Sequence, residues 1–229
     1  MKPLVVINPN SSTVVTAGIE KAVEPLVPLG LPMRFLTLAE GPPGIENQMQ
    51  ADLVISPLLQ LAEQQKDAAG FVIACFGDPG LHAMRDLVSV PVVGIQEAAV
   101  MTALTLGQRF GVISILDRSI PRHMRAFGAM GVMDRLAGDR ALGLGVAELA
   151  DENRALGAMI ETGKRLRDND GADVLIMGCA GMAGYRGILE AELSLPVVEP
   201  CQAAVATAIG QIKLGYGQKI KRNTTDDTG

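Results

Sequence analysis

The chain alternates short apolar runs with longer amphipathic segments. The runs are five to seven residues long and rich in Val, Ile and Leu, as expected for strands buried on both faces of a parallel sheet. They lie at 4–8, 33–38, 70–76, 91–95, 110–116, 143–149, 173–179 and 196–200. Apolar residues recur at helical spacing in 51–69, 152–168 and 202–212. The pattern predicts an α/β protein with a doubly wound parallel sheet arrangement.

The sequence also carries an internal repeat. Residues 91–103 and 196–208 are identical at eight of thirteen positions, and Cys75 and Cys179 precede these segments at almost the same distance. We therefore predict two pseudo-symmetric, flavodoxin-like halves of four parallel strands each, with the active site in the cleft between them. The first half spans 1–104, with a last helix that can cross over, the second spans 105–218, and 219–229 forms a polar tail.

Composition narrows the classes of function. The chain has 20 basic and 25 acidic residues, a net charge of −5, no Trp and only 3% aromatic residues, which argues against nucleic-acid partners. No apolar stretch is long enough to span a membrane. Three cysteines without close spacing fit a reducing, cytoplasmic setting. The high apolar content predicts a homo-oligomer.

Cys75 and Cys179 are the leading candidates for chemistry. Each lies at the end of an apolar run and just before a glycine-containing turn, in ACFGDPGL and GCAGMAG. The carboxyl ends of parallel strands form the ligand-binding edge of such sheets, and exposed turn amides favour a thiolate. The alternative is that both are inert core residues, which is the more common role of a free cysteine. For Cys201 we expect that structural role at the start of a helix.

Polar residues follow the first strand of each half. Asn10 and Ser11 lie in INPNSS, where short polar side chains can cap a helix or bind a ligand, and Ser114 and Ser119 occupy the related positions of the second half. No dinucleotide or phosphate-loop motif is present, and the histidine and cysteine spacing does not suit zinc, so we predict no cofactor and no metal. His82 and His123 are expected on solvated faces. The roles of Glu97 and Glu199 stay open.

These motifs resemble the aspartate/glutamate/hydantoin racemase superfamily, in its hydantoin and allantoin racemase branch. The resemblance rests on NPNSS, on ACFGDPGLHAMRDLVSVPVVGIQEAA and on GCAGM followed by PVV, and it spans most of the chain. It implies a cofactor-independent enzyme with Cys75 and Cys179 as catalytic residues. The substrate-binding residues that we predict are Asn10, Ser11, Ile45, Phe76, Gly77, Asp78, Ser114, Ser119, Ala180, Gly181 and Met182.

The implied reaction explains why two thiols are needed. Inverting a stereocentre without a cofactor requires a base on one face of the carbon and an acid on the other. The predicted function is racemisation at C5 of a 5-monosubstituted hydantoin or of allantoin. The alternatives are an amino-acid racemase of the aspartate or glutamate type, a decarboxylase or isomerase on the same scaffold, and a non-catalytic small-molecule binding protein.

Overall fold

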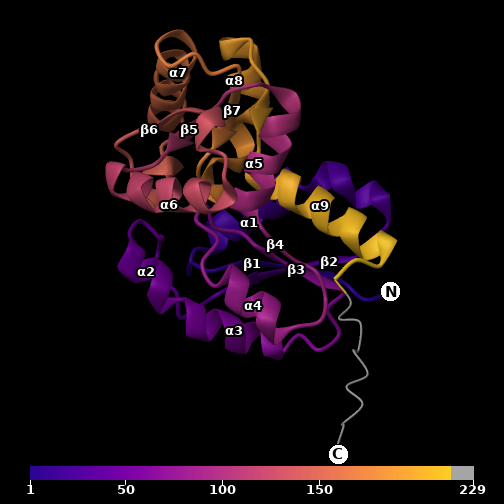
Figure 1. Cartoon of the computed structure of the whole chain (residues 1–229). Helices are drawn as coiled ribbons and strands as arrows, with labels where there is room; N and C mark the ends of the chain where they lie inside the picture. The colour runs from indigo at the N-terminus through magenta and orange to yellow at the C-terminus, as the bar shows by residue number, and fades with distance from the viewer. Residues whose placement is uncertain (218–229) are drawn as a thin grey trace, which may run out of the picture.

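A computed structural model of the protein describes residues 1–217 and contains two four-stranded sheets in which every strand pair is parallel (Figure 1). The strand orders are β2-β1-β3-β4 and β6-β5-β7-β8, so the second sheet repeats the topology of the first. The strands of the first sheet are β1 (Leu4–Asn8), β2 (Met33–Thr37), β3 (Gly70–Ile73) and β4 (Val92–Gly94). Those of the second are β5 (Phe110–Ser114), β6 (Leu136–Ala141), β7 (Val174–Met177) and β8 (Val197–Val198). The predicted fold class is confirmed.

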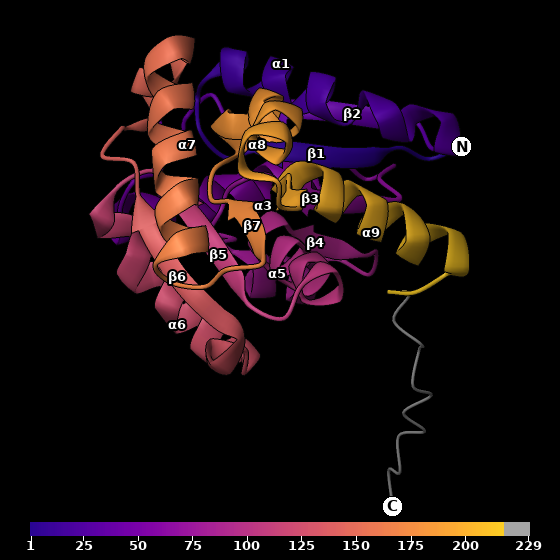
Figure 2. The same ribbon diagram turned by 90° about the horizontal axis from the view of Figure 1, so that it is seen from above.

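Helices cover both sheets (Figure 2). The α-helices are α1 (Thr13–Ala22), α2 (Gln48–Leu53), α3 (Ile55–Glu63), α4 (Leu81–Leu87), α5 (Ile95–Leu106), α6 (Ile120–Met130), α7 (Glu152–Asp168), α8 (Arg186–Leu193) and α9 (Pro200–Leu214). Short 3-10 helices are η1 (Glu24–Leu29), η2 (Asp117–Ser119), η3 (Met133–Arg135), η4 (Val146–Ala150) and η5 (Ala180–Tyr185). The helix predicted over 51–69 is instead shared by α2 and α3 and ends at Glu63.

Alternation along each strand divides the core. In β1, Leu4 and Val6 face a central cluster that both sheets share, whereas Val5 and Ile7 face a cluster beneath α3 and α4. All four are essentially fully buried, as expected for a parallel strand covered on both faces. The central cluster therefore joins the two sheets through one continuous apolar interior.

Helices α5 and α9 each contribute one buried face to that interior. Although α5 follows the last strand of the first sheet, it packs on β7 and β5, and α9 packs on β3 and β4 in return (Figure 1). The two helices contact each other, and the fully buried Ala99 and Ala103 of α5 and Ala204 and Ala208 of α9 belong to the same core cluster. The division of the chain near residue 104 remains a prediction, and the predicted tail, 219–229, lies outside the described residues.

The prediction of a strand at 143–149 is wrong. The edge strand β6 lies earlier, at Leu136–Ala141, and Val146–Ala150 forms η4. All six residues of β6 are only half-buried, and the strand contains Asp139 and Arg140. It therefore has no apolar run from which the sequence could predict it. The apolar residues of the predicted strand, Leu144, Val146 and Leu149, pack instead into the cluster of the second half.

Within residues 1–217, no helix has both the length and the apolar character needed to cross a bilayer.

Candidate active site

Equivalent backbone hydrogen bonds fix the positions of the two cysteines. The amide of Ala74 donates to the carbonyl of Ile7 at 2.8 Å, and the amide of Gly178 donates to the carbonyl of Ile113, also at 2.8 Å. Each bond extends the central strand pair of its sheet by one residue, and each is followed directly by a cysteine. A side chain on residue 178 would clash with the Ile113 carbonyl, at 2.7 Å, so the second turn requires glycine.

Both cysteines line one pocket between the two halves. Fourteen residues from both halves form its wall: Asn10, Val15, Ile45, Ala74, Cys75, Phe76, Ile115, Ser119, Arg122, Val146, Gly178, Cys179, Ala180 and Gly181. The two thiol-bearing residues are partly accessible, whereas Cys201 is fully buried in the first turn of α9, as expected. The chain therefore places a thiol from each half at a common small cavity.

Six of the predicted binding residues line this pocket and five do not. Those in the wall are Asn10, Ile45, Phe76, Ser119, Ala180 and Gly181. Those outside it are Ser11, Gly77, Asp78, Ser114 and Met182. The Ser11 amide donates to the Pro42 carbonyl at 3.0 Å, and Met182 is fully buried in the core of the second half.

The carboxylate of Asp78 is engaged by the first turn of α5. It accepts hydrogen bonds from the amides of Gln96 and Glu97, both at 2.9 Å, and so satisfies two of the unpaired donors at a helix start. Burial raises the pKa of Asp78 to about 7. The neighbouring Glu97 pairs with Arg85 at 2.9 Å. In the second half, the side chain of Glu199 has this role at the start of α9. Its carboxylate accepts hydrogen bonds from the amides of Cys201, at 3.0 Å, and Gln202, at 2.5 Å.

Ser114 belongs to a buried polar cluster behind the pocket wall. Its hydroxyl donates to Asp139 at 2.5 Å and lies 3.2 Å from His123 Nδ1, which lies 2.9 Å from the other Asp139 oxygen. The expectation that His123 is solvated is therefore wrong, because only 1% of this residue is exposed. Its ring packs edge-on against Phe76, with centroids 5.0 Å apart. His82 is exposed, as predicted.

A hydrogen-bond network orients Asn10. Its amide oxygen accepts from Asn8 Nδ2 and from the Ser12 amide, both at 2.9 Å. This arrangement leaves the side-chain nitrogen of Asn10, Nδ2, as the donor available at the pocket wall. Ser12 is the N-cap of α1 and accepts from the Val15 amide at 3.3 Å, so part of the NPNSS motif is helix capping.

Burial of the two thiols disfavours their thiolate forms. Burial raises the pKa of Cys75 to about 12 and that of Cys179 to about 11. Two groups oppose this effect. The charge of Arg122 lowers both pKa values, and the Gly181 amide, which donates to Cys179 Sγ at 3.4 Å, lowers that of Cys179.

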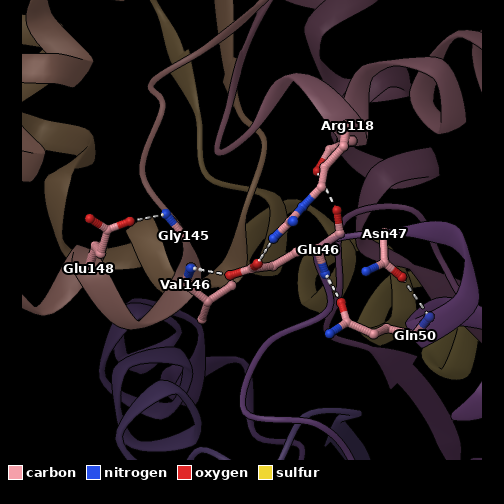
Figure 3. Close-up of polar contacts among 8 residues, drawn as sticks. Glu46, Asn47, Gln50, Arg118, Gly145, Val146 and Glu148 are labelled. Carbon is pink, nitrogen blue, oxygen red and sulfur yellow. Dashed lines mark hydrogen bonds and ion pairs between the residues drawn. The ribbon is translucent and has the colours of Figure 1, made fainter.

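Glu46 joins three loops at the edge of the pocket (Figure 3). Its carboxylate accepts from the Val146 amide at 3.0 Å and from the Arg118 guanidinium, and its backbone carbonyl accepts from the Ser119 hydroxyl at 3.4 Å. Its own amide donates to Gln50 Oε1 at 2.8 Å. Because Ile45, Ser119 and Val146 all line the pocket, this Glu46 clasp connects the two halves beside the thiols.

Sequence reasoning missed Arg122 and the Glu46 clasp. Arg122 lies in the first turn of α6, where its only sequence signal was a charged residue in a helical pattern. Glu46 lies in a loop of the first half, 72 residues from Arg118. Neither contact leaves a motif in the sequence, since both depend on how the halves pack.

Two thiols from duplicated α/β halves, facing one pocket, match an established class of protein. The Asp/Glu/hydantoin racemase family model matches residues 4–208, and the chain belongs to this family. Among its relatives, hydantoin racemase of Paenarthrobacter aurescens is 35% identical over 96% of this chain and 95% of its own length. The structure of allantoin racemase from Klebsiella pneumoniae superposes with a TM-score of 0.88 at 31% identity, covering 95% of this chain and 90% of that one.

More distant structures share the fold alone. A doubly substituted arylmalonate decarboxylase superposes with a TM-score of 0.73 at 20% identity, over 95% of this chain and 97% of that one. One scaffold therefore occurs in proteins named for different reactions, so the fold alone does not define the reaction of this chain.

Proposed function

We propose that this protein is a cofactor-independent racemase that inverts C5 of 5-monosubstituted hydantoins or of allantoin. The observation that carries the proposal is the pair Cys75 and Cys179, which reach one pocket from two different halves. A single base would return the proton to the face from which it came, whereas two groups on opposite sides can invert the centre. The names of the relatives support this substrate class.

In the proposed reaction, one cysteine acts as thiolate and the other as thiol. The thiolate removes the proton from C5, the C–H electron pair forms the enolate, and the opposite thiol delivers its proton to the other face. The second cysteine is then the thiolate, ready for the opposite enantiomer. The backbone amide of Ala180 and the side-chain amide nitrogen of Asn10 are the donors proposed to hold the ring oxygens.

The remaining parts of the proposal concern the setting. Free thiols are the working groups, so the proposed location is the reducing cytoplasm. The proposed assembly is a homo-oligomer, which exposed apolar side chains such as Met101 and Leu106 on α5 support. None of the described residues form a cluster of metal-ligand type, and the proposed mechanism uses neither a metal nor a cofactor.

Deuterium exchange tests the mechanism. In D₂O, the enzyme should racemise an enantiomerically pure 5-substituted hydantoin and introduce deuterium at C5. Chiral chromatography measures the inversion, and mass spectrometry measures the deuterium. Cys75→Ser and Cys179→Ser should each lower the rate by at least about 100-fold. Cys201→Ala, which changes a core cysteine outside the pocket, should keep the activity. Turnover near the wild-type rate in both pocket variants would contradict the two-base mechanism.

A substrate panel separates the alternatives. Allantoin, aspartate, glutamate and an arylmalonate are offered to the same enzyme, and inversion and CO₂ release are measured. Selective inversion of ring substrates supports the proposal. Selective inversion of the free amino acids, or decarboxylation, would replace it.

A further inference from the structure

Arg122 is a buried cation without a counter-ion. Only 8% of the residue is exposed, its Nη2 donates a long hydrogen bond of 3.4 Å to the Phe76 carbonyl, and Nε and Nη1 have no partner. The arginines that form ion pairs among the described residues all have side chains about one-third exposed or more. Arg122 forms no such ion pair in that part of the chain, although it is buried. A buried charge is costly unless it is paired and hydrogen-bonded, so an anion is missing from this site.

The turn after Cys75 is shaped around this guanidinium. Gly77 has a φ of +120°, which favours glycine, and a Cβ there would lie 2.6 Å from Arg122 Nε. Arg122 also lines the pocket together with both cysteines. The unpaired cation is therefore built into the substrate pocket itself, supported by the same loop that carries Cys75.

Nearby acidic groups are already engaged. Glu46 bonds to Arg118 and to the Val146 amide, and Asp78 caps α5. Asp139 is held by Ser114 and His123.

The thiols do not supply the missing charge either. Neither sulfur accepts a hydrogen bond from the Arg122 guanidinium, and burial raises the pKa of both thiols. The remaining source of negative charge is a ligand.

We propose that Arg122 binds a carboxylate on the substrate, so that the enzyme prefers hydantoins whose 5-substituent is acidic over uncharged ones. This inference rests on the proposed function, because it assigns the substituent of the same substrate. The reacting ring lies between the thiols, and the substituent carboxylate pairs with the guanidinium. A charged pair formed in a buried site adds selectivity because the matching neutral ligand leaves the cation unpaired.

Two ligands of the same shape test the assignment: 5-(2-carboxyethyl)hydantoin and 5-(2-carbamoylethyl)hydantoin, which differ in charge alone. The measured quantity is the ratio of their kcat/KM values in wild type, Arg122→Gln, Arg122→Lys and Arg125→Gln. Arg125 lies on the same helix but is exposed and contacts Gln48, so it serves as the matched control. We expect the wild type and Arg125→Gln to favour the carboxylate by at least tenfold. Arg122→Gln should lower that ratio to near one, mainly through KM, and Arg122→Lys should restore part of it.

A wild-type ratio near one, or a ratio that Arg122→Gln leaves unchanged, would overturn the inference. Calorimetry on the Cys75→Ser/Cys179→Ser double variant keeps the test separate from turnover. Tighter binding of the carboxylate ligand than of the amide ligand supports the assignment, whether or not the wild type racemises them. Failure of the wild type to racemise either ligand would count against the proposed function. Equal affinities for the two ligands would overturn the assignment.

Discussion

The carboxylate of Asp78 occupies the space in which a side chain on Gly94 would lie. A Cβ at residue 94 would be 2.6 Å from Asp78 Oδ1 and closer still to its Cγ. The φ of Gly94 is −87°, a value open to any residue, so the requirement for glycine is one of space. The loop that follows Cys75 is thereby locked to the start of α5.

Gly94→Ala should therefore destabilise the protein. The added methyl group must displace a carboxylate that caps two amides of α5, and we expect the free energy of unfolding to fall by about 3 kcal/mol. Urea denaturation followed by circular dichroism measures the change. Gly128→Ala in α6 is the control, since a Cβ there meets nothing within 4 Å, and it should stabilise by about 0.5–1 kcal/mol. Equal stability of Gly94→Ala and wild type would show that Asp78 moves freely.

The Glu46 clasp should limit access to Cys179. Glu46→Gln weakens the bond to Arg118, and it also removes a negative charge that raises the pKa of Cys179. The first effect opens access to Cys179 and the second increases its thiolate fraction, so we expect iodoacetamide to alkylate Cys179 several-fold faster than in wild type.

Peptide mass spectrometry gives the site of labelling. Cys201 serves as an internal control, because it is fully buried and should stay unlabelled in both proteins. An unchanged rate at Cys179 would mean that the clasp does not govern the pocket.

The cluster of Ser114, His123 and Asp139 should act as a structural support of the pocket wall. Asp139→Ala leaves a buried hydroxyl and a buried ring nitrogen without their acceptor, and we expect unfolding to become easier by about 3 kcal/mol. Thermal and urea unfolding measure the loss. Asp134→Ala, an exposed position in the nearby η3, should change stability by no more than about 0.5 kcal/mol. A similarly small effect at Asp139 would contradict a structural role.

The rate of exchange at C5 should rise with pH. Burial raises the pKa of both pocket thiols, so the thiolate fraction at neutral pH is small and grows about tenfold for each pH unit below the pKa. We expect kcat/KM for deuterium incorporation to follow this slope from pH 6 to 9, after subtraction of the exchange seen with the Cys75→Ser/Cys179→Ser double variant. A flat profile would show that the base is already ionised in the free enzyme.

Much of the fold was predictable because it depends on local patterns. Apolar runs identified seven of the eight strands, because six of them are buried on both faces and the half-buried β2 still carries Met33, Phe35 and Leu36. The edge strand β6 escaped because its half-buried residues include Asp139 and Arg140. The helix predicted over 152–168 has the bounds of α7.

The sequence by itself determined the duplication, the parallel α/β class and the two strand-end cysteines, because each is written in short segments of chain. Only the tertiary structure decided which side chains share the pocket. It brought the unpaired Arg122 beside Cys75, placed Glu46 across the gap to Arg118, and buried His123 and Ser114 behind the wall. These relationships arise from the packing of one half against the other, and contacts between residues far apart in the chain leave no periodic signal in either segment.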